Sequence, residues 1–194
     1  MNFTLTICMK RLATAALIFN FGVAAIYAQQ RPVKMTFSGT SAPSTVDLKQ
    51  PGTNTGEENF AGYGTLGLFT FRNISAETTT PQSSSTCSPG NAPPKLYFLR
   101  VAGGGVFHFL DGSLLKVNLT QGDDCVDLMA HEGHCTMIFQ ITGGTGRFKD
   151  ASGTLTLTET VLPVLADASN PPSPVFFAAT GEVTGAVAIN DERQ

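Results

Sequence analysis

The sequence predicts an all-β domain, built as a closed barrel or a sandwich of antiparallel strands, and three observations support this. Short runs rich in Val, Ile, Thr and Phe alternate with Gly, Pro, Asn and Asp. No window after the first 28 residues keeps the apolar spacing of an amphipathic helix over three turns. Only 14% of the 194 residues are charged, against about 25% in ordinary soluble domains. This composition excludes coiled coils and highly charged disordered chains.

The first 28 residues are predicted to be a secretory signal peptide. A basic pair precedes the nearly continuous apolar run Leu12–Ala28, and Ile26 and Ala28 suit the −3 and −1 positions of a cleavage site. The alternative is an uncleaved membrane anchor, for which a run of about 17 residues is short. We therefore expect an exported protein, periplasmic or extracellular, with residues 29–194 forming a single domain.

The charge balance limits the classes of partner. The chain has 12 Lys and Arg against 15 Asp and Glu, and two of the basic residues belong to the predicted signal. The remaining domain is mildly acidic, which excludes a strongly basic nucleic-acid binder. We also expect no attraction to anionic membranes once the signal is cleaved.

Nine segments have the composition of β-strands, and alternating faces indicate antiparallel, half-buried strands. Polar or Pro-rich loops are expected at 41–59, 77–94 and 163–174, and bulges at Gly181 and Gly185. The predicted strands are Val33–Thr40, Tyr63–Asn73, Lys95–Val101, Val106–Leu110, Ser113–Thr120, Cys125–Met129, Cys135–Thr142, Gly153–Leu162 and Val175–Ile189.

Three cysteines follow the signal, so at most one intramolecular disulfide forms. Cys125 and Cys135 flank a polar stretch, and if they end two strands of one hairpin they face each other at a distance that permits a bridge. This Cys125–Cys135 disulfide is the favoured pairing. Cys87 lies in a Ser/Pro/Gly loop that is able to reach either of them.

One motif resembles a known superfamily. The stretch from Ile141 to Gly153, ITGGTGRFKDASG, is similar to the allene oxide cyclase-like barrels, which include plant dirigent proteins and exported bacterial proteins. The resemblance implies an eight-stranded antiparallel β-barrel with an apolar lumen, frequently in homo-oligomers. It also implies that Phe148 plugs a barrel end. The motif residues are Gly143, Gly144, Thr145, Gly146, Arg147, Phe148 and Gly153.

Two charged residues are candidates for chemistry inside such a barrel. Glu159 shares a face with Leu155 and Leu157, so by strand period it points with the apolar residues. There its pKa would rise and it would act as an acid or base. Arg100 follows Leu96 and Phe98 on one face and suits a buried carboxylate or an anionic ligand. For both, the alternative is a solvated position at the barrel rim.

Apolar side chains supply the candidate ligand contacts in the lumen, which are Phe107, Phe109, Met137, Phe139, Leu155 and Leu157. Phe176 and Phe177 add to the aromatic supply. His108 alternates with the flanking Phe residues, so it faces the opposite side and is expected to be structural or exposed.

A second polar cluster invites a metal interpretation, but its pattern favours a solvated turn. The motif is HEGH rather than HExxH, and in a hairpin loop the spacing of the two histidines fixes no shared face. We therefore predict neither a metal nor a cofactor. The cluster comprises Asp123, Asp124, Asp127, His131, Glu132 and His134.

Three functions remain open. The favoured one is a non-enzymatic exported barrel that binds a small apolar ligand or acts as an envelope or secreted interaction protein. The second is a cyclase- or dirigent-like enzyme that steers a reactive intermediate mainly by shape, with Glu159 and Arg100 stabilising charge. The third is a structural barrel whose lumen is filled by side chains.

Overall fold

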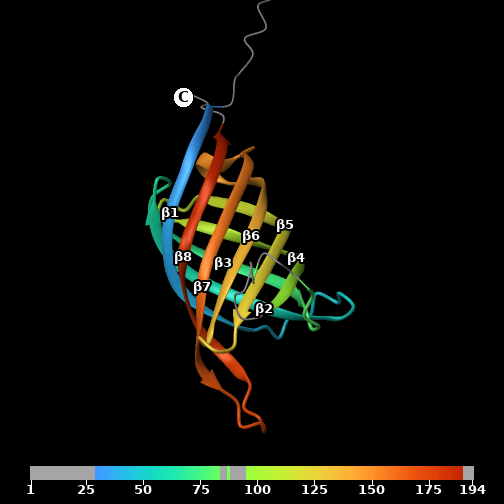
Figure 1. The fold of residues 1–194 in the computed structure, drawn as a ribbon. Coiled ribbons are helices and arrows are strands. Elements are labelled where there is room, and N and C mark those ends of the chain that lie inside the picture. Colours follow the sequence, from blue (N-terminus) through green and yellow to red (C-terminus); the bar gives the residue numbers. More distant parts are fainter. Residues whose placement is uncertain (1–28, 84–86, 88–94, 190–194) are drawn as a thin grey trace, which may run out of the picture.

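The computed structural model describes residues 29–83, 87 and 95–189, which form a closed eight-stranded antiparallel barrel (Figure 1). Each strand pairs with the next in sequence, and the last pairs with the first. This confirms the predicted all-β barrel; the predicted signal peptide lies outside the described residues. The strands are β1 Gln29–Pro43, β2 Thr53–Gly64, β3 Phe69–Thr78, β4 Leu96–Phe109, β5 Leu114–Asp127, β6 Glu132–Gly144, β7 Ser152–Ala166 and β8 Pro174–Ile189.

Strand β2 falls in a segment that the sequence assigns largely to a loop, and that prediction is wrong. Its sequence, TNTGEENFAGYG, contains residues that are depleted in strands. It forms because β1 and β3 pair with it on both sides. The predicted single strand Tyr63–Asn73 is also wrong, because the chain turns between Gly64 and Phe69.

Four of the predicted strands merge into two. The segments 95–101 and 106–110 belong largely to the continuous β4, and 113–120 and 125–129 belong largely to β5. The register of β5 against β6 shifts between Leu119 and Gln121. This irregularity bends the strand without ending it.

The predicted bulges at Gly181 and Gly185 do not occur, since β8 keeps an unbroken register with β1 and β7 at both. The glycines instead allow close approach: a Cβ on Gly181 would lie 2.7 Å from the Phe37 ring. The register shifts lie near Leu165, where β7 and β8 extend as a hairpin at the bottom of Figure 1.

One end of the barrel is closed by short connections and aromatic packing. The 3₁₀ turn η1, Gly146–Phe148, joins β6 to β7 and buries Phe148 completely. Its ring lies 4.7 Å from that of Phe109, and the Arg147 guanidinium covers both rings. Gly146 has a φ of 57°, which favours glycine. We call this the closed end; the connections β1–β2, β3–β4, β5–β6 and β7–β8 form the opposite end, which we call the mouth.

The disulfide joins Cys87 to Cys125, so the predicted Cys125–Cys135 pairing is wrong. The register pairs Cys125 with His134 and Cys135 with Asp124. Because neighbouring residues on a strand face opposite sides, this offset of one residue separates the two thiols. Cys135 is free and buried inside the barrel.

Within the described ranges, no helix has both the length and the apolar character needed to cross a membrane.

Candidate functional site

Arg100 is the centre of a buried charged network in the half of the barrel nearer the mouth. Its Nε donates to Asp124 Oδ2 at 2.8 Å and its Nη2 to Asp124 Oδ1 at 3.3 Å. Its Nη1 donates to Glu58 Oε1, and to Ser75 Oγ at 2.9 Å. Its Nη2 also lies 3.9 Å from Glu159 Oε1. These residues come from five strands, so closure of the barrel is what brings them together.

Glu58 is almost completely buried and is held from two sides. One carboxyl oxygen accepts from Arg100, and the other accepts from Asn73 Nδ2 at 2.9 Å. Asn73 Nδ2 also lies 3.7 Å from Met137 Sδ. The network therefore sits directly against the apolar core, where unpaired charge is costly.

Two carboxyl groups beside Arg100 have opposite pKa shifts. Burial opposes ionisation of Asp124, but the charge and hydrogen bonds of Arg100 hold its pKa below the ordinary value. Glu77 pairs with Arg100 in the register of β3 and β4. Burial, followed by the charge of Asp124, raises the pKa of Glu77 to about 8. At neutral pH the network thus holds Asp124 ionised and Glu77 largely protonated.

Glu159 lies inside the barrel as its strand period predicts. Within the described part of the chain, neither of its carboxyl oxygens has a hydrogen-bond partner. Burial, and then the charge of Glu58, raises its pKa well above the ordinary value. Burial likewise raises the pKa of the neighbouring Cys135 thiol, so that thiol is a poor nucleophile.

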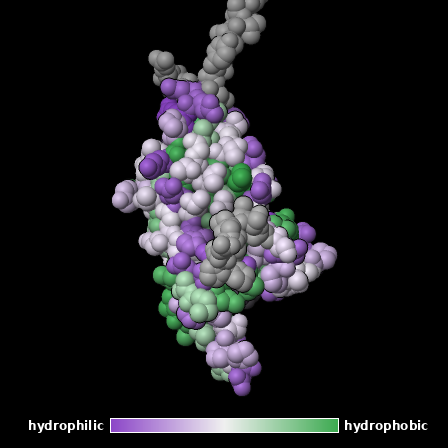
Figure 2. Space-filling view, in the orientation of Figure 1, coloured by the Kyte–Doolittle hydropathy of each residue, from purple (hydrophilic) through white to green (hydrophobic). Residues whose placement is uncertain are grey.

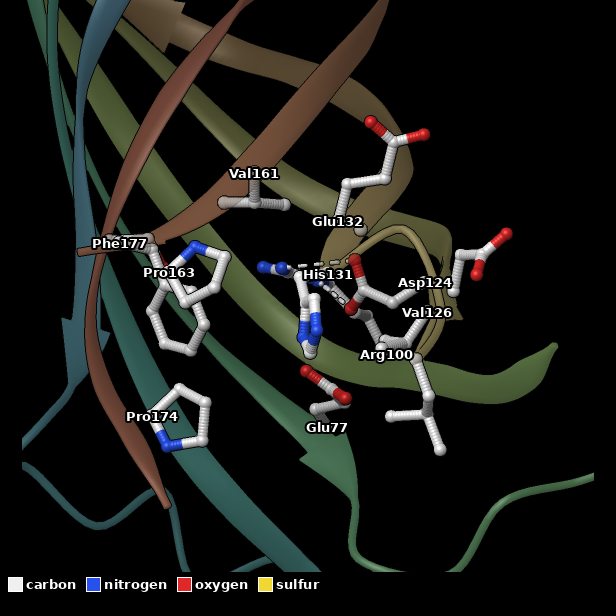
Figure 3. A pocket seen from close by; sticks show the side chains of 14 residues that line it. Glu77, Arg100, Asp124, Val126, His131, Glu132, Val161, Pro163, Pro174 and Phe177 are labelled. Atoms are coloured by element: carbon white, nitrogen blue, oxygen red, sulfur yellow. Dashed lines mark hydrogen bonds and ion pairs between the residues drawn. The ribbon is translucent and has the colours of Figure 1, made fainter. Parts of the chain in front are cut away.

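A cavity of about 240 Å³ opens from this network to the mouth. Figure 3 shows the carboxyl group of Glu77 below the Arg100–Asp124 pair, with Phe177, Pro163 and Pro174 across the cavity. The floor is polar and the walls are largely apolar. The lining residues include Glu77, Arg100 and Asp124 at the floor, Val126, Leu128, Val161, Pro163, Pro174 and Phe177 along the walls, His131 in the β5–β6 turn and Glu132 at the start of β6.

The structure separates the predicted lumen residues from this cavity. All six are buried in the packed core, and none is among the residues that line the cavity. Stacking of Phe71 on Phe107, with ring centroids 4.1 Å apart, fills the lumen between them. A ligand role for these six residues stays a prediction: Phe107, Phe109, Met137, Phe139, Leu155 and Leu157.

The polar cluster near the β5–β6 turn is divided by the barrel wall. Asp124 points inward to Arg100, whereas His134 is exposed and lies 3.1 Å from Glu132 and 3.2 Å from Thr160 Oγ1. Among the described residues, no group of three or more His, Cys, Asp or Glu is arranged to hold a metal ion. His108 is exposed on the outer face of β4, as its alternation predicts.

Sequence reasoning identifies Arg100 and Glu159 and counts Phe177 in the aromatic supply for a ligand, but it misses Glu58 and Glu77. Glu58 lies two residues before the buried Phe60 and therefore on the same face. This signal is readable only once β2 is recognised as a strand. Glu77 lies at the predicted start of a loop. Its position becomes informative only through its cross-strand pairing with Arg100.

Comparisons with known proteins give little for this chain. No family model matches it, and no curated protein matches. Among solved structures, the chain is similar to a pterocarpan synthase dirigent protein, at 11% identity and a TM-score of 0.43. The match covers 86% of this chain and 88% of the other. At that level of similarity, nothing follows about what this chain binds.

Proposed function

We propose that this protein is an exported barrel that binds a small, largely apolar molecule in the mouth cavity. One observation carries the proposal: the cavity has apolar walls over a buried polar floor, while the other half of the lumen is packed solid. Apolar walls with a few placed polar groups are typical of small-molecule sites.

The surroundings of the cavity support this assignment. Figure 2 shows hydrophobic side chains gathered at the lower part of the barrel, beside the projecting β7–β8 hairpin. A disulfide suits an oxidising compartment. The resemblance of the GGTGRF motif to exported barrels is in keeping with the same function. Exposed apolar residues of the β7 end and the β5–β6 turn are Leu128, Met129, Leu162, Val164 and Leu165.

Native mass spectrometry of protein purified from its own host tests the proposal. We expect a co-purified apolar molecule, or a rise in Tm with members of an apolar ligand panel. Phe177→Ser removes a cavity wall and should weaken binding. Phe176→Ser, on the other face of the same strand, is the matched control and should not. A protein without bound mass and without any shift in Tm would contradict the proposal.

A catalytic barrel is the second candidate, and the protonation of Glu77 favours it. A carboxyl group with a pKa of about 8 keeps its proton at neutral pH and is placed to give it to a bound molecule. Incubation of the co-purified ligand in D₂O with the protein should then place deuterium on a carbon atom. Glu77→Gln should prevent this incorporation. If the unaltered protein incorporated no deuterium, the catalytic candidate would be wrong and only the binding function would stand.

A further inference from the structure

Acidic groups outnumber basic groups in the network at the floor of the mouth cavity, and this excess indicates the chemical class of the ligand. One guanidinium group, that of Arg100, faces four carboxyl groups. The other charged groups at the mouth do not offset this surplus of acid. Lys95 pairs with Asp127 at 3.5 Å, His131 lies in the β5–β6 turn, and Glu132 is the first residue of β6. The four carboxyl groups belong to Glu58, Glu77, Asp124 and Glu159.

Four of the five N–H donors of Arg100 are already hydrogen-bonded to neighbouring side chains. Its Nε–H and one Nη2–H go to the two oxygens of Asp124. Both protons of Nη1 go to Glu58 and Ser75. The second Nη2–H faces Glu159, 3.9 Å away. With its remaining N–H beside the buried Glu159, Arg100 has no pair of free donors to offer a carboxylate or phosphate head.

Of the four carboxyl groups, Glu77 and Asp124 line the cavity, and both oxygens of Asp124 already accept hydrogen bonds from Arg100. Asp124, Arg100 and Glu58 act on the charge of Glu77 from β5, β4 and β2. Repulsion from Asp124 is one cause of its retained proton. A cation placed beside Glu77 would offset that repulsion and favour the carboxylate.

We propose that the mouth cavity selects amphiphiles with a cationic amine head, held by Glu77 and Asp124, and an apolar tail along the cavity walls. This rests on the proposed function. The head replaces the proton that Glu77 holds, and that proton passes to the buffer. The tail packs on Val161 and Phe177 and continues over the apolar residues of the mouth. Binding is therefore linked to release of about one proton per ligand near pH 7.

Three probes of equal tail length separate the head groups: octylammonium chloride, 1-octanol and sodium octanoate. By isothermal titration calorimetry at pH 7, we expect octylammonium to bind about tenfold more tightly than octanol. Octanoate should bind most weakly. Repeating the octylammonium titration in phosphate and in Tris, whose ionisation enthalpies differ, should show proton release.

Two variants test whether Glu77 causes the preference for octylammonium over octanol. Glu77→Gln should remove the advantage of octylammonium over octanol while octanol still binds. Glu182→Gln makes the same change on the exposed outer face of β8 and should keep that advantage. Equal binding of octylammonium and octanol, or tighter binding of octanoate, would overturn the amine head and leave the proposed function standing. If none of the three probes bound to the unaltered protein or to either variant, both proposals would fail.

Discussion

The two halves of the barrel interior are built from the same eight strands but differ in chemistry. Toward the closed end, the lumen is filled by stacked and tilted phenylalanine rings. Toward the mouth, the same inward positions carry Glu58, Arg100, Asp124 and Glu159, with a cavity beside them. Aromatic packing gives stability that does not vary with pH, whereas a buried ionic network ties stability and binding to protonation. The strand scaffold therefore separates a structural half from a half suited to binding.

Removal of Arg100 should have the largest effect on stability. Arg100→Met leaves buried carboxylates without a counter-charge, so the free energy of unfolding at pH 7 should fall by about 4 kcal/mol. At pH 5 part of the loss should be regained as these groups take up protons. Urea unfolding followed by far-UV circular dichroism measures both values.

Arg72→Met is the control for Arg100→Met. Arg72 pairs with Glu57 at 3.3 Å on the outer surface, and its side chain is 67% exposed. An exposed pair of this kind contributes less than about 1 kcal/mol. If the two variants lost equal stability, the contrast between the inner network and the surface would be wrong.

The next largest effect is the pH dependence of the unaltered protein. Glu77 binds its proton more tightly when folded, with a pKa of about 8. Its contribution is therefore fully present below the ordinary carboxyl pKa and is lost as pH rises through 8. Between pH 5 and 8 the contribution of Glu77 to the free energy of unfolding should fall by about 3 kcal/mol, and Glu159, whose pKa is also raised, acts in the same direction. Glu77→Gln should remove the Glu77 part of this fall, and Glu182→Gln should keep it.

Loss of the disulfide should affect the mouth more than the closed end. The bridge closes a separation of 38 residues and ends one residue after Asp124. The double variant Cys87→Ser/Cys125→Ser should lower the free energy of unfolding by about 2 kcal/mol. Amide hydrogen exchange should quicken in Leu96–Arg100 and Asp123–Asp127 before it does around Phe148. Uniform quickening along β4 and β5 would contradict this division.

The smallest effect is expected in the closed half. Ile141 is buried near the start of the GGTGRF motif. Ile141→Val removes one methylene group and should cost about 1 kcal/mol. The loss should be the same at pH 5 and pH 8, because no titratable group is changed. A strongly pH-dependent loss would show that the two halves are coupled.

The sequence predicts the closed half better than the mouth, for a physical reason. Phe148 and its glycines form a local motif, and the inward residues Met137 and Leu157 follow plain alternation. The charged half depends on non-local pairing: Glu58 and Glu77 join Arg100 only across neighbouring strands. Strand β2 has a weak intrinsic preference for the extended state and forms through pairing with its neighbours. Local sequence patterns therefore do not predict that Glu58 belongs to the site.

The free thiol of Cys135 has a consequence for how the protein oxidises. Cys135 and Cys125 lie on opposite sides of the barrel wall, offset by one position in the pairing of β5 with β6. Joining them would require a one-residue slip of one strand, which would also turn Asp124 to the solvent side if β5 moved, or Met137 if β6 moved. A disulfide between Cys87 and Cys125 therefore indicates the correct register of β5 with β6, and one between Cys125 and Cys135 indicates a slipped register. Peptide mapping under non-reducing conditions would distinguish correctly aligned molecules from slipped ones even after unfolding.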